Sequence, residues 1–228
     1  MHYVISDIHG NERRFHALLR MIRLQPEDTL YVLGDVVDRH PGGIRILRKI
    51  MSMPNARMLL GNHEYMMLRA LGFPRDDYRD NGGARAHWFR NGGEVTLNHF
   101  KYLRKTLRQE IVEYLQGLPL SFDVEVNGTH FKLVHGAPAE EYVPAPKYPS
   151  AAYYAVWKRL DVGEPSPEGY LLIFGHTPTR YYQESCPMKV WRDGNRIGID
   201  CGCGYPEEDP RGRLACLRLE DGKTYYVQ

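Results

Sequence analysis

The sequence lacks the long apolar segment that a membrane-spanning helix requires. Such a helix needs about 18 or more consecutive apolar residues, and no run in the 228-residue chain approaches that length. The chain also opens directly into a β-rich segment, without the basic and apolar regions of a secretory leader. We therefore expect a cytoplasmic protein with no membrane partner.

A strong excess of charge of one sign is also missing. The chain has 30 Lys and Arg against 28 Asp and Glu, a formal net charge of +2. Because proteins that bind nucleic acids generally carry a marked basic excess, we expect no nucleic-acid partner. The hydrophobic share of 43% and the charged share of 25% are typical of a globular domain, and the length predicts a single domain over residues 1–228.

Cysteine is scarce, and internal repeats are absent. The four cysteines all lie in the last quarter of the chain, at positions that fit no common zinc-site spacing: Cys186, Cys201, Cys203 and Cys216. The Cys-x-Cys spacing at 201–203 is too short for an easy internal disulfide. We therefore expect buried, reduced thiols rather than a disulfide framework.

What the sequence does have is five short polar blocks, each of which follows an apolar, β-rich run. In chain order the blocks are SDIHG, GDVVDR, GNHE, VHG and GHTP, and their candidate metal ligands are Asp7, His9, Asp35, Asn62, His135 and His176. Carboxylate and amide oxygens mixed with imidazole nitrogens suit divalent transition metals. Two such ions about 3.5–4 Å apart are a common device for displacement at phosphorus. The blocks therefore predict two bound divalent ions, with Mn²⁺ as the expected metal and iron, zinc or nickel as alternatives.

The spacing within the blocks suggests how the ligands divide. Asp7 and His9 are two residues apart, so at a strand end both side chains would face the same way and reach one metal. Asp35 follows the next strand, and because a carboxylate can be shared by two cations, we assign it the bridging position. Asn62 offers a neutral oxygen, and the adjacent His63 would point elsewhere.

Proton transfer and phosphate binding are assigned to the remaining residues of the blocks. His63 has a side chain suited to a general acid, and Asp38 could hold it protonated and oriented. Arg39 offers a planar fork that can bind two phosphoryl oxygens. We place a second phosphate-binding arginine at Arg159, on a short helix in AVWKRL. The residue pattern alone favours the alternative that Arg159 is a solvated surface residue. Glu64 is expected to be a first-turn helix carboxylate.

The pattern of elements predicts an α/β (α+β) fold of mixed or packed sheets with helices outside. Strands and helices alternate three times in the first 70 residues, with strands near 2–7, 29–35 and 56–62 and helices near 11–24, 43–52 and 63–71. Right-handed crossovers make these strands parallel and gather the polar blocks at their carboxyl ends. The rest is predicted to be helical over 76–117 with a break at 91–93, a hairpin at 121–134, a proline-rich loop over 137–169 with a helix near 150–160, and strands near 170–175, 188–192, 195–200, 212–219 and 224–228.

The five blocks resemble those of the metallophosphoesterases. GDVVDR together with GNHE is similar to the phosphoprotein phosphatase type, and AHWFRNGG, AVWKRL, IFGHTP and IDCGCG extend the resemblance to the short bacterial and phage protein serine/threonine phosphatases. The resemblance implies a central β-sandwich flanked by helices, with the site at one end. It also implies the site residues: one metal on Asp7, His9 and Asp35, the other on Asp35, Asn62, His135 and His176, His63 as the general acid supported by Asp38, and Arg39 and Arg159 on the phosphate.

These residues lead us to expect a dinuclear phosphomonoester hydrolase, and specifically a protein serine/threonine phosphatase acting on a phosphorylated protein or peptide. A water bridging the two metals would attack phosphorus, and His63 would protonate the leaving alkoxide. A dinucleoside polyphosphate hydrolase or a small-molecule phosphatase on the same site is the alternative, and a non-catalytic metal-binding scaffold is a third. No regulatory subunit can be inferred from the sequence.

Overall fold

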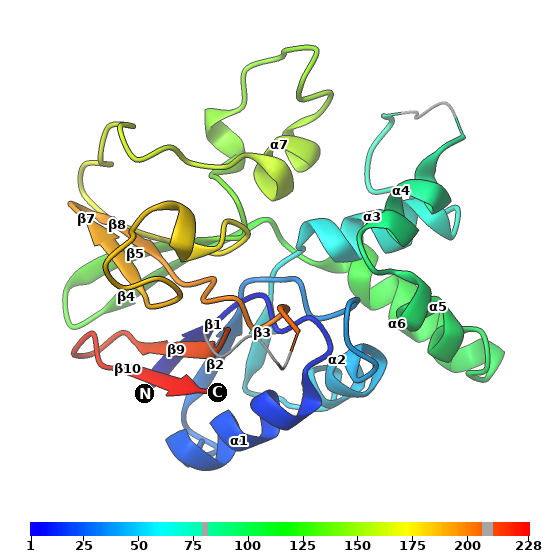
Figure 1. The fold of residues 1–228 in the computed structure, drawn as a ribbon, viewed down its shortest axis with the longest axis horizontal. Helices are drawn as coiled ribbons and strands as arrows, with labels where there is room; N and C mark the ends of the chain where they lie inside the picture. Colours follow the sequence, from blue (N-terminus) through cyan, green and yellow to red (C-terminus); the bar gives the residue numbers. More distant parts are fainter. Residues whose placement is uncertain (79–81, 207–211) are drawn as a thin grey trace.

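Two five-stranded β-sheets pack face to face, with helices on the outside, in a computed structural model that describes residues 1–78, 82–206 and 212–228 (Figure 1). Sheet A has the strand order β10-β9-β1-β2-β3, and sheet B has the order β4-β5-β6-β8-β7. Both sheets mix parallel and antiparallel pairs. The mixed α/β fold predicted from the sequence is therefore confirmed.

Sheet A contains the three N-terminal strands and the two C-terminal ones. The parallel strands are β1 (His2–Ile5), β2 (Thr29–Val32) and β3 (Ala56–Met58). Strand β9 (Leu214–Arg218) pairs antiparallel with β1, and β10 (Thr224–Val227) pairs antiparallel with β9 at the edge of the sheet. Side chains alternate between its faces. Val4 packs toward sheet B, whereas its neighbours Tyr3 and Ile5 pack against the helices.

Sheet B begins with the predicted hairpin. Strands β4 (Ser121–Val126) and β5 (Thr129–Val134) are joined by Asn127 and Gly128, both at positive φ (52° and 76°), as a two-residue hairpin turn requires. Strands β6 (Leu171–Phe174) and β8 (Arg196–Gly198) then continue the sheet parallel to β5, and β7 (Trp191–Asp193) closes the edge. Sheets A and B therefore each contain three neighbouring parallel strands.

Most of the helices cover the outer face of sheet A or extend to one side of the sandwich, and the last one packs against the outer face of sheet B (Figure 1). Their bounds are α1 Glu12–Ile22, α2 Gly43–Met51, α3 Asn62–Ala70, α4 Ala84–Arg90, α5 Glu94–Phe100, α6 Lys105–Gly117 and α7 Ala151–Trp157. Buried side chains such as Phe15, Leu18 and Leu47 fill the layer between the helices and sheet A. A second core lies between the sheets, where Leu33 and Leu133 are fully buried.

The strands of sheet A end earlier than predicted. They were expected to reach residues 7, 35 and 62, but the last strand residues are Ile5, Val32 and Met58. The chain leaves the extended conformation at this edge, where Asp7 and Asp35 have φ values of 53° each. The predicted helical stretch 76–117 becomes α4, α5 and α6, with 76–78 not helical and 79–81 outside the described residues.

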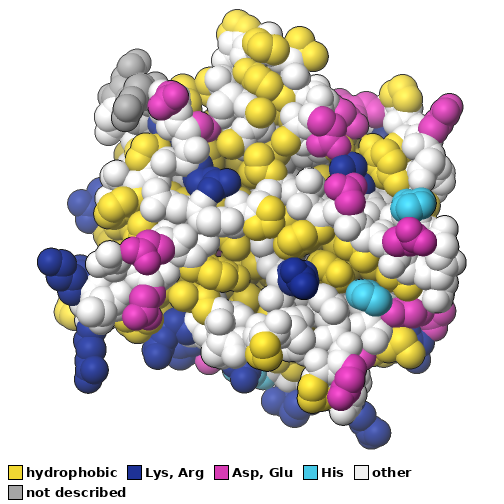
Figure 2. Space-filling view, turned by 180° about the vertical axis from the view of Figure 1, so that it is seen from behind, with side chains coloured by type: hydrophobic (Ala, Val, Ile, Leu, Met, Phe, Trp, Pro, Cys, Tyr) yellow, Lys and Arg dark blue, Asp and Glu magenta, His cyan; other side chains and the backbone are white. Residues whose placement is uncertain are grey.

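Three of the four cysteines are buried free thiols as expected, namely Cys201, Cys203 and Cys216. The expectation is wrong for Cys186, which is free but exposed. In the described ranges, no helix combines the length and apolarity needed to span a bilayer. On the face in Figure 2, basic and acidic side chains are interspersed around a central group of hydrophobic side chains.

Candidate active site

All six predicted metal ligands lie together where parallel strands of both sheets end. Asp7 and Asp35 follow β1 and β2, and Asn62 opens α3 just after β3. His135 and His176 follow β5 and β6 of the other sheet. Each of the six side chains belongs to a residue no more than 7% exposed. The site therefore sits between the sheets, at one edge of the sandwich.

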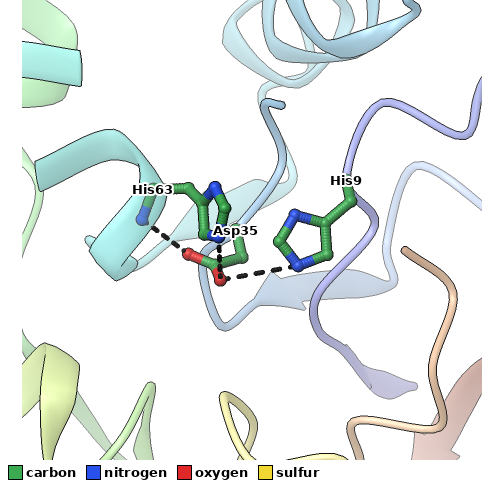
Figure 3. A group of neighbouring side chains, drawn as sticks. All are labelled: His9, Asp35 and His63. Carbon is green, nitrogen blue, oxygen red and sulfur yellow. Dashed lines mark hydrogen bonds and ion pairs between the residues drawn. The ribbon is translucent and has the colours of Figure 1, made fainter. Parts of the chain in front are cut away.

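The Asp35 carboxylate occupies the middle of this cluster. Its Oδ2 lies 3.6 Å from His9 Nε2 and 3.8 Å from His63 Nε2, and its Oδ1 lies 3.5 Å from His135 Nε2. Figure 3 shows the rings of His9 and His63 on either side of the carboxylate. Two sets of ligand atoms could each hold an ion, one from His9, Asp35 and His63 and the other from Asp35, His135 and His176. Asp35 belongs to both sets, as its predicted bridging role requires.

Asn62 and Asp7 both contact His176 and complete the cluster. The Asn62 Oδ1 lies 2.9 Å from His135 Nε2 and 2.8 Å from His176 Nδ1, so three potential ligand atoms of one ion already converge. The Asp7 carboxylate accepts hydrogen bonds from the Ser6 hydroxyl and from the backbone N–H of His176. The prediction that Asp7 and His9 share one strand face is wrong in detail, because both residues lie in a left-handed turn after β1.

Three histidines are oriented by their second ring nitrogen. Each pairs that nitrogen with a backbone carbonyl: His9 with Val37 at 3.2 Å, His135 with Leu33 at 2.7 Å, and His176 with Trp157 at 3.2 Å. A ring N–H donated to a carbonyl leaves the other nitrogen with a lone pair, and that nitrogen faces the cluster. This is the arrangement by which proteins orient metal-bound histidines.

The electrostatics of the cluster favour cations. Burial raises the pKa of Asp35 to about 7 and raises that of Asp7 well above its usual value, with Asp200 adding to the effect on Asp7. Burial also lowers the pKa of His9, His135 and His176. A buried carboxylate needs positive charge close by to stay ionised, and a neutral imidazole has a ring nitrogen whose lone pair can bind a metal. The donor set therefore fits divalent ions.

His63 and Asp38 form the predicted pair, at 2.7 Å between Nδ1 and Oδ2. Asp38 also accepts hydrogen bonds from Trp88 Nε1 at 2.8 Å and from the Thr96 hydroxyl at 2.6 Å. Burial raises the pKa of Asp38 to about 7 and lowers that of His63 to about 4. A negatively charged phosphoryl group beside Nε2 would favour the protonated imidazole. The adjacent residues Asn62 and His63 were expected at a strand end, but both lie in the first turn of α3.

The two predicted phosphate-binding arginines lie on the exposed side of the site. The Arg39 guanidinium is 3.4 Å from His63 Nε2. Arg159 is exposed and lies two residues beyond the end of α7, not on that helix as predicted, because the chain is extended at Lys158. Its charge contributes to the lowered pKa of His176, which places it near the cluster. The contact of either arginine with phosphate remains a prediction.

Glu64 has a role that the sequence did not reveal. It lies in the first turn of α3, as expected, but it is fully buried. Its carboxylate accepts hydrogen bonds from the backbone N–H groups of Asp35 (2.8 Å), Val36 (2.8 Å) and Val37 (3.1 Å). Glu64 therefore fixes the loop that carries Asp35.

Three further residues were not identified from the sequence. Trp88 and Thr96 hold Asp38, and the only sequence signal for Trp88 was its place in AHWFRNGG. Asp200 is 5% exposed and its charge acts on Asp7. It follows the apolar strand β8 just as the predicted ligands follow theirs, and that position was the signal available.

Residues 3–202 match the family model described as calcineurin-like phosphoesterase. The chain belongs to this family. Among curated relatives, the symmetrical bis(5'-nucleosyl)-tetraphosphatase of Salmonella arizonae is 38% identical, with 99% of this chain and 93% of the relative aligned. The protein of the same name from Paracidovorax citrulli is 28% identical over 83% of this chain, and the chain spans 62% of that relative's length.

Solved structures share the fold. A protein provisionally named a diadenosine tetraphosphatase has a TM-score of 0.66 at 16% identity, over 99% of this chain and 92% of its own. A protein serine/threonine phosphatase from Saccharomyces cerevisiae has a TM-score of 0.60 at 16% identity, over 100% of this chain and 80% of its own. At such identities the comparison shows only a shared fold. Because both a diadenosine tetraphosphatase and a protein phosphatase have this fold, it does not identify the substrate.

Proposed function

We propose that this calcineurin-like phosphoesterase is a divalent-metal-dependent hydrolase of dinucleoside tetraphosphates that splits them symmetrically. The observation that carries the proposal is the 38% identity, along nearly the whole of both chains, to a relative named for that activity. The buried ligand cluster supports the proposal, because hydrolysis of a polyphosphate requires a site for phosphoryl transfer. The phosphoprotein substrate expected from the sequence stays a prediction, and the alternative substrate class has the better support.

The chemistry is the addition of water to one of the two central phosphorus atoms. A new P–O bond forms, the central anhydride bond breaks, and the two products are nucleoside diphosphates. One ion would be held by Asp7, His9 and Asp35. The other would be held by Asp35, Asn62, His135 and His176. When bound, two divalent ions would neutralise the phosphoryl charge and lower the pKa of a water molecule.

The chain's own exposed groups would then act on the phosphates. Arg39 can offer two parallel N–H donors to the oxygens of one phosphoryl group, and Arg159 can contribute from near His176. His63 can deliver a proton from Nε2 to the departing oxygen while Asp38 holds Nδ1. A diphosphate oxygen is a weaker base than an alkoxide, so this substrate class needs less help from His63.

A substrate panel in Mn²⁺ tests the proposal directly. The panel contains diadenosine tetraphosphate, a phosphoserine peptide and a phosphotyrosine peptide, and nucleotide products are separated by ion-exchange chromatography. We expect ADP as the sole nucleotide product and the highest kcat/KM for diadenosine tetraphosphate, with activity abolished by a chelator. Formation of ATP and AMP would show asymmetric cleavage, and a higher kcat/KM for a phosphopeptide would restore the phosphoprotein assignment.

A further inference from the structure

A pocket of about 370 Å³ lies beside the ligand cluster, between α3, α4 and α7. That volume falls in the range of small-molecule sites. None of its lining residues belongs to the predicted active-site set. The pocket is thus available for a part of the substrate that does not react.

Aromatic side chains form one continuous wall of this pocket. Tyr153 contacts Tyr65 and Tyr78 edge to face, at centroid distances of 5.9 Å and 5.6 Å, and stacks with Trp157 at 5.8 Å. Trp157 also stacks with His87 at 5.5 Å. Planar aromatic faces of this kind bind nucleobases by stacking, with little dependence on which base is present.

Cationic side chains line the same pocket. The Arg69 guanidinium lies over the Tyr78 ring at 4.4 Å, donates to the Tyr78 carbonyl at 2.7 Å and pairs with the Asp76 carboxylate at 3.5 Å, and these contacts fix its position. Arg90 is exposed and, within the described ranges, has no carboxylate partner. A wall that combines arginines with aromatic rings suits a ligand that has a flat base and a negatively charged chain.

The pocket adjoins the ligand cluster through one of its lining residues. Trp157 packs edge-on against the His176 ring at 5.9 Å, and its carbonyl pairs with His176 Nε2. Along α3, Arg69 lies six residues after His63, which is about 9 Å of helix. A short polyphosphate chain can span such a distance. A ligand in the pocket would therefore be joined to the reacting phosphate by the rest of the polyphosphate.

We propose that this pocket binds the nucleoside end of the substrate, with the base against Tyr153 and Trp157 and the adjoining phosphates near Arg69 and Arg90. The assignment rests on the proposed function for its substrate class. A hydrophobic side chain of a phosphopeptide is the competing occupant. It would use the aromatic wall, but it would gain nothing from the arginines.

The test compares Tyr153→Leu and Arg90→Ala with the parent protein on two substrates. Diadenosine tetraphosphate has nucleosides, and p-nitrophenyl phosphate has none. We expect each variant to lower the ratio of the two kcat/KM values about tenfold, while Tyr153→Phe, which keeps the stacking face, retains it. Tyr102→Leu is the matched control, because Tyr102 is 82% exposed and lies outside the pocket. An unchanged ratio in both pocket variants would overturn the proposal.

Inhibition of p-nitrophenyl phosphate hydrolysis separates this proposal from the proposed function. ADP should inhibit the parent at least tenfold more strongly than inorganic phosphate, and Tyr153→Leu should remove most of that advantage. If ADP is no better than phosphate, the pocket is not a nucleoside site. Another outcome is that ADP inhibits more strongly than phosphate, with that advantage lost in Tyr153→Leu, while diadenosine tetraphosphate is not cleaved. In that case the proposed function fails and the nucleoside site stands. Circular dichroism of each variant checks that it is folded.

Discussion

Asp38 is held by three donors at once, and this fixes the ring of His63. The pair distance of 2.7 Å and the bonds from Trp88 and Thr96 leave Asp38 fully buried with its oxygens directed. A carboxylate with its hydrogen bonds satisfied in this way holds the imidazole in one orientation. His63 Nε2 then remains directed toward Asp35 and Arg39, where a phosphoryl group would bind.

At the residue scale, His63→Asn should lower the rate without emptying the metal site. For substrates with a strongly basic leaving group the loss should be about 10²–10⁴-fold, the usual contribution of a general acid. It should be smaller for p-nitrophenyl phosphate than for phenyl phosphate, because p-nitrophenolate leaves more easily unprotonated. Steady-state kinetics on both esters and metal analysis measure this. His130→Asn is the control, since that side chain is 64% exposed.

His63 also belongs to one of the two possible ligand sets, so the same variant distinguishes its roles. A fall in bound metal by one ion per chain would make His63 a ligand. An equal loss of rate on p-nitrophenyl phosphate and phenyl phosphate would exclude proton donation by His63.

A second residue-scale prediction concerns the close approach of Gly61 to Asp35. A Cβ at position 61 would lie 2.3 Å from Asp35 Oδ1 and 2.4 Å from its backbone N, so Gly61→Ala must displace the central carboxylate. We expect a loss of manganese affinity of at least tenfold, measured by calorimetric titration. Gly117→Ala is the matched control, because a Cβ there meets nothing within 4 Å. Equal affinities in the two variants would contradict the central placement of Asp35.

Sequence reasoning could locate the ligands because each has a local signal, namely a polar residue directly after an apolar strand. It could not reveal how they are held. Asp38 is 50 residues from Trp88 and 58 from Thr96, and Glu64 is 29 from Asp35, so these contacts exist only after folding. The left-handed backbone of Asp7 and His9 also has no signature in residue spacing.

At the element scale, the site depends on where strands stop and helices begin. Strand β1 leads into α1 through the turn that carries Asp7 and His9, and β2 leads into α2 through the loop that carries Asp35. The helices are joined to each other by an ion pair in which Arg45 on α2 lies 2.6 Å from Glu12 on α1. This pair ties together the two helices that follow the first two ligand loops.

Arg45→Gln should reduce the free energy of unfolding by at most about 1 kcal/mol at pH 7, because the pair is largely exposed. The hydrogen bond from Arg45 lowers the pKa of Glu12 below its usual 4.5. A carboxyl with a lowered folded pKa stabilises above its unfolded pKa, and that stability is lost as the pH falls through the folded value. The difference between parent and variant should therefore shrink below about pH 4.

Urea titrations at pH 7 and pH 3.5 measure this difference. Arg48→Gln, on the same helix but not paired with Glu12, should show no comparable pH dependence. A parent-to-variant difference that is as large at pH 3.5 as at pH 7 would mean that Arg45 acts through packing instead.

Element types were predictable from the sequence, whereas the order of strands was not. Alternating strands and helices predicted β1 to β3 as a parallel group, and the pattern over 121–134 predicted the hairpin of β4 and β5. No local pattern shows that β9 returns from the far end of the chain to pair with β1. Such long-range pairing is decided by packing of the finished sheets.

For the whole molecule, the important feature is that the ligands come from both sheets. Asp7, Asp35 and Asn62 follow strands of sheet A, and His135 and His176 follow strands of sheet B. Ions bound among them would link the two sheets at their common edge. Because the unfolded chain has no such cluster, ion binding stabilises only the folded state.

Manganese should therefore raise the thermal midpoint of the whole protein, with saturation at two ions per chain. An ion at 100 times its dissociation constant adds about 2.7 kcal/mol to the free energy of unfolding. In a chain of this size that corresponds to a midpoint shift of about 5–10 °C for each ion bound, which a chelator should reverse. Differential scanning calorimetry with parallel metal analysis provides the measurement.

Asp35→Asn should lose most of the shift, since Asp35 belongs to both ligand sets. The control Asp123→Asn, at a carboxylate that is 75% exposed, should keep the shift. A stoichiometry that never exceeds one ion, or a midpoint unchanged by manganese, would show that the cluster does not hold a metal pair.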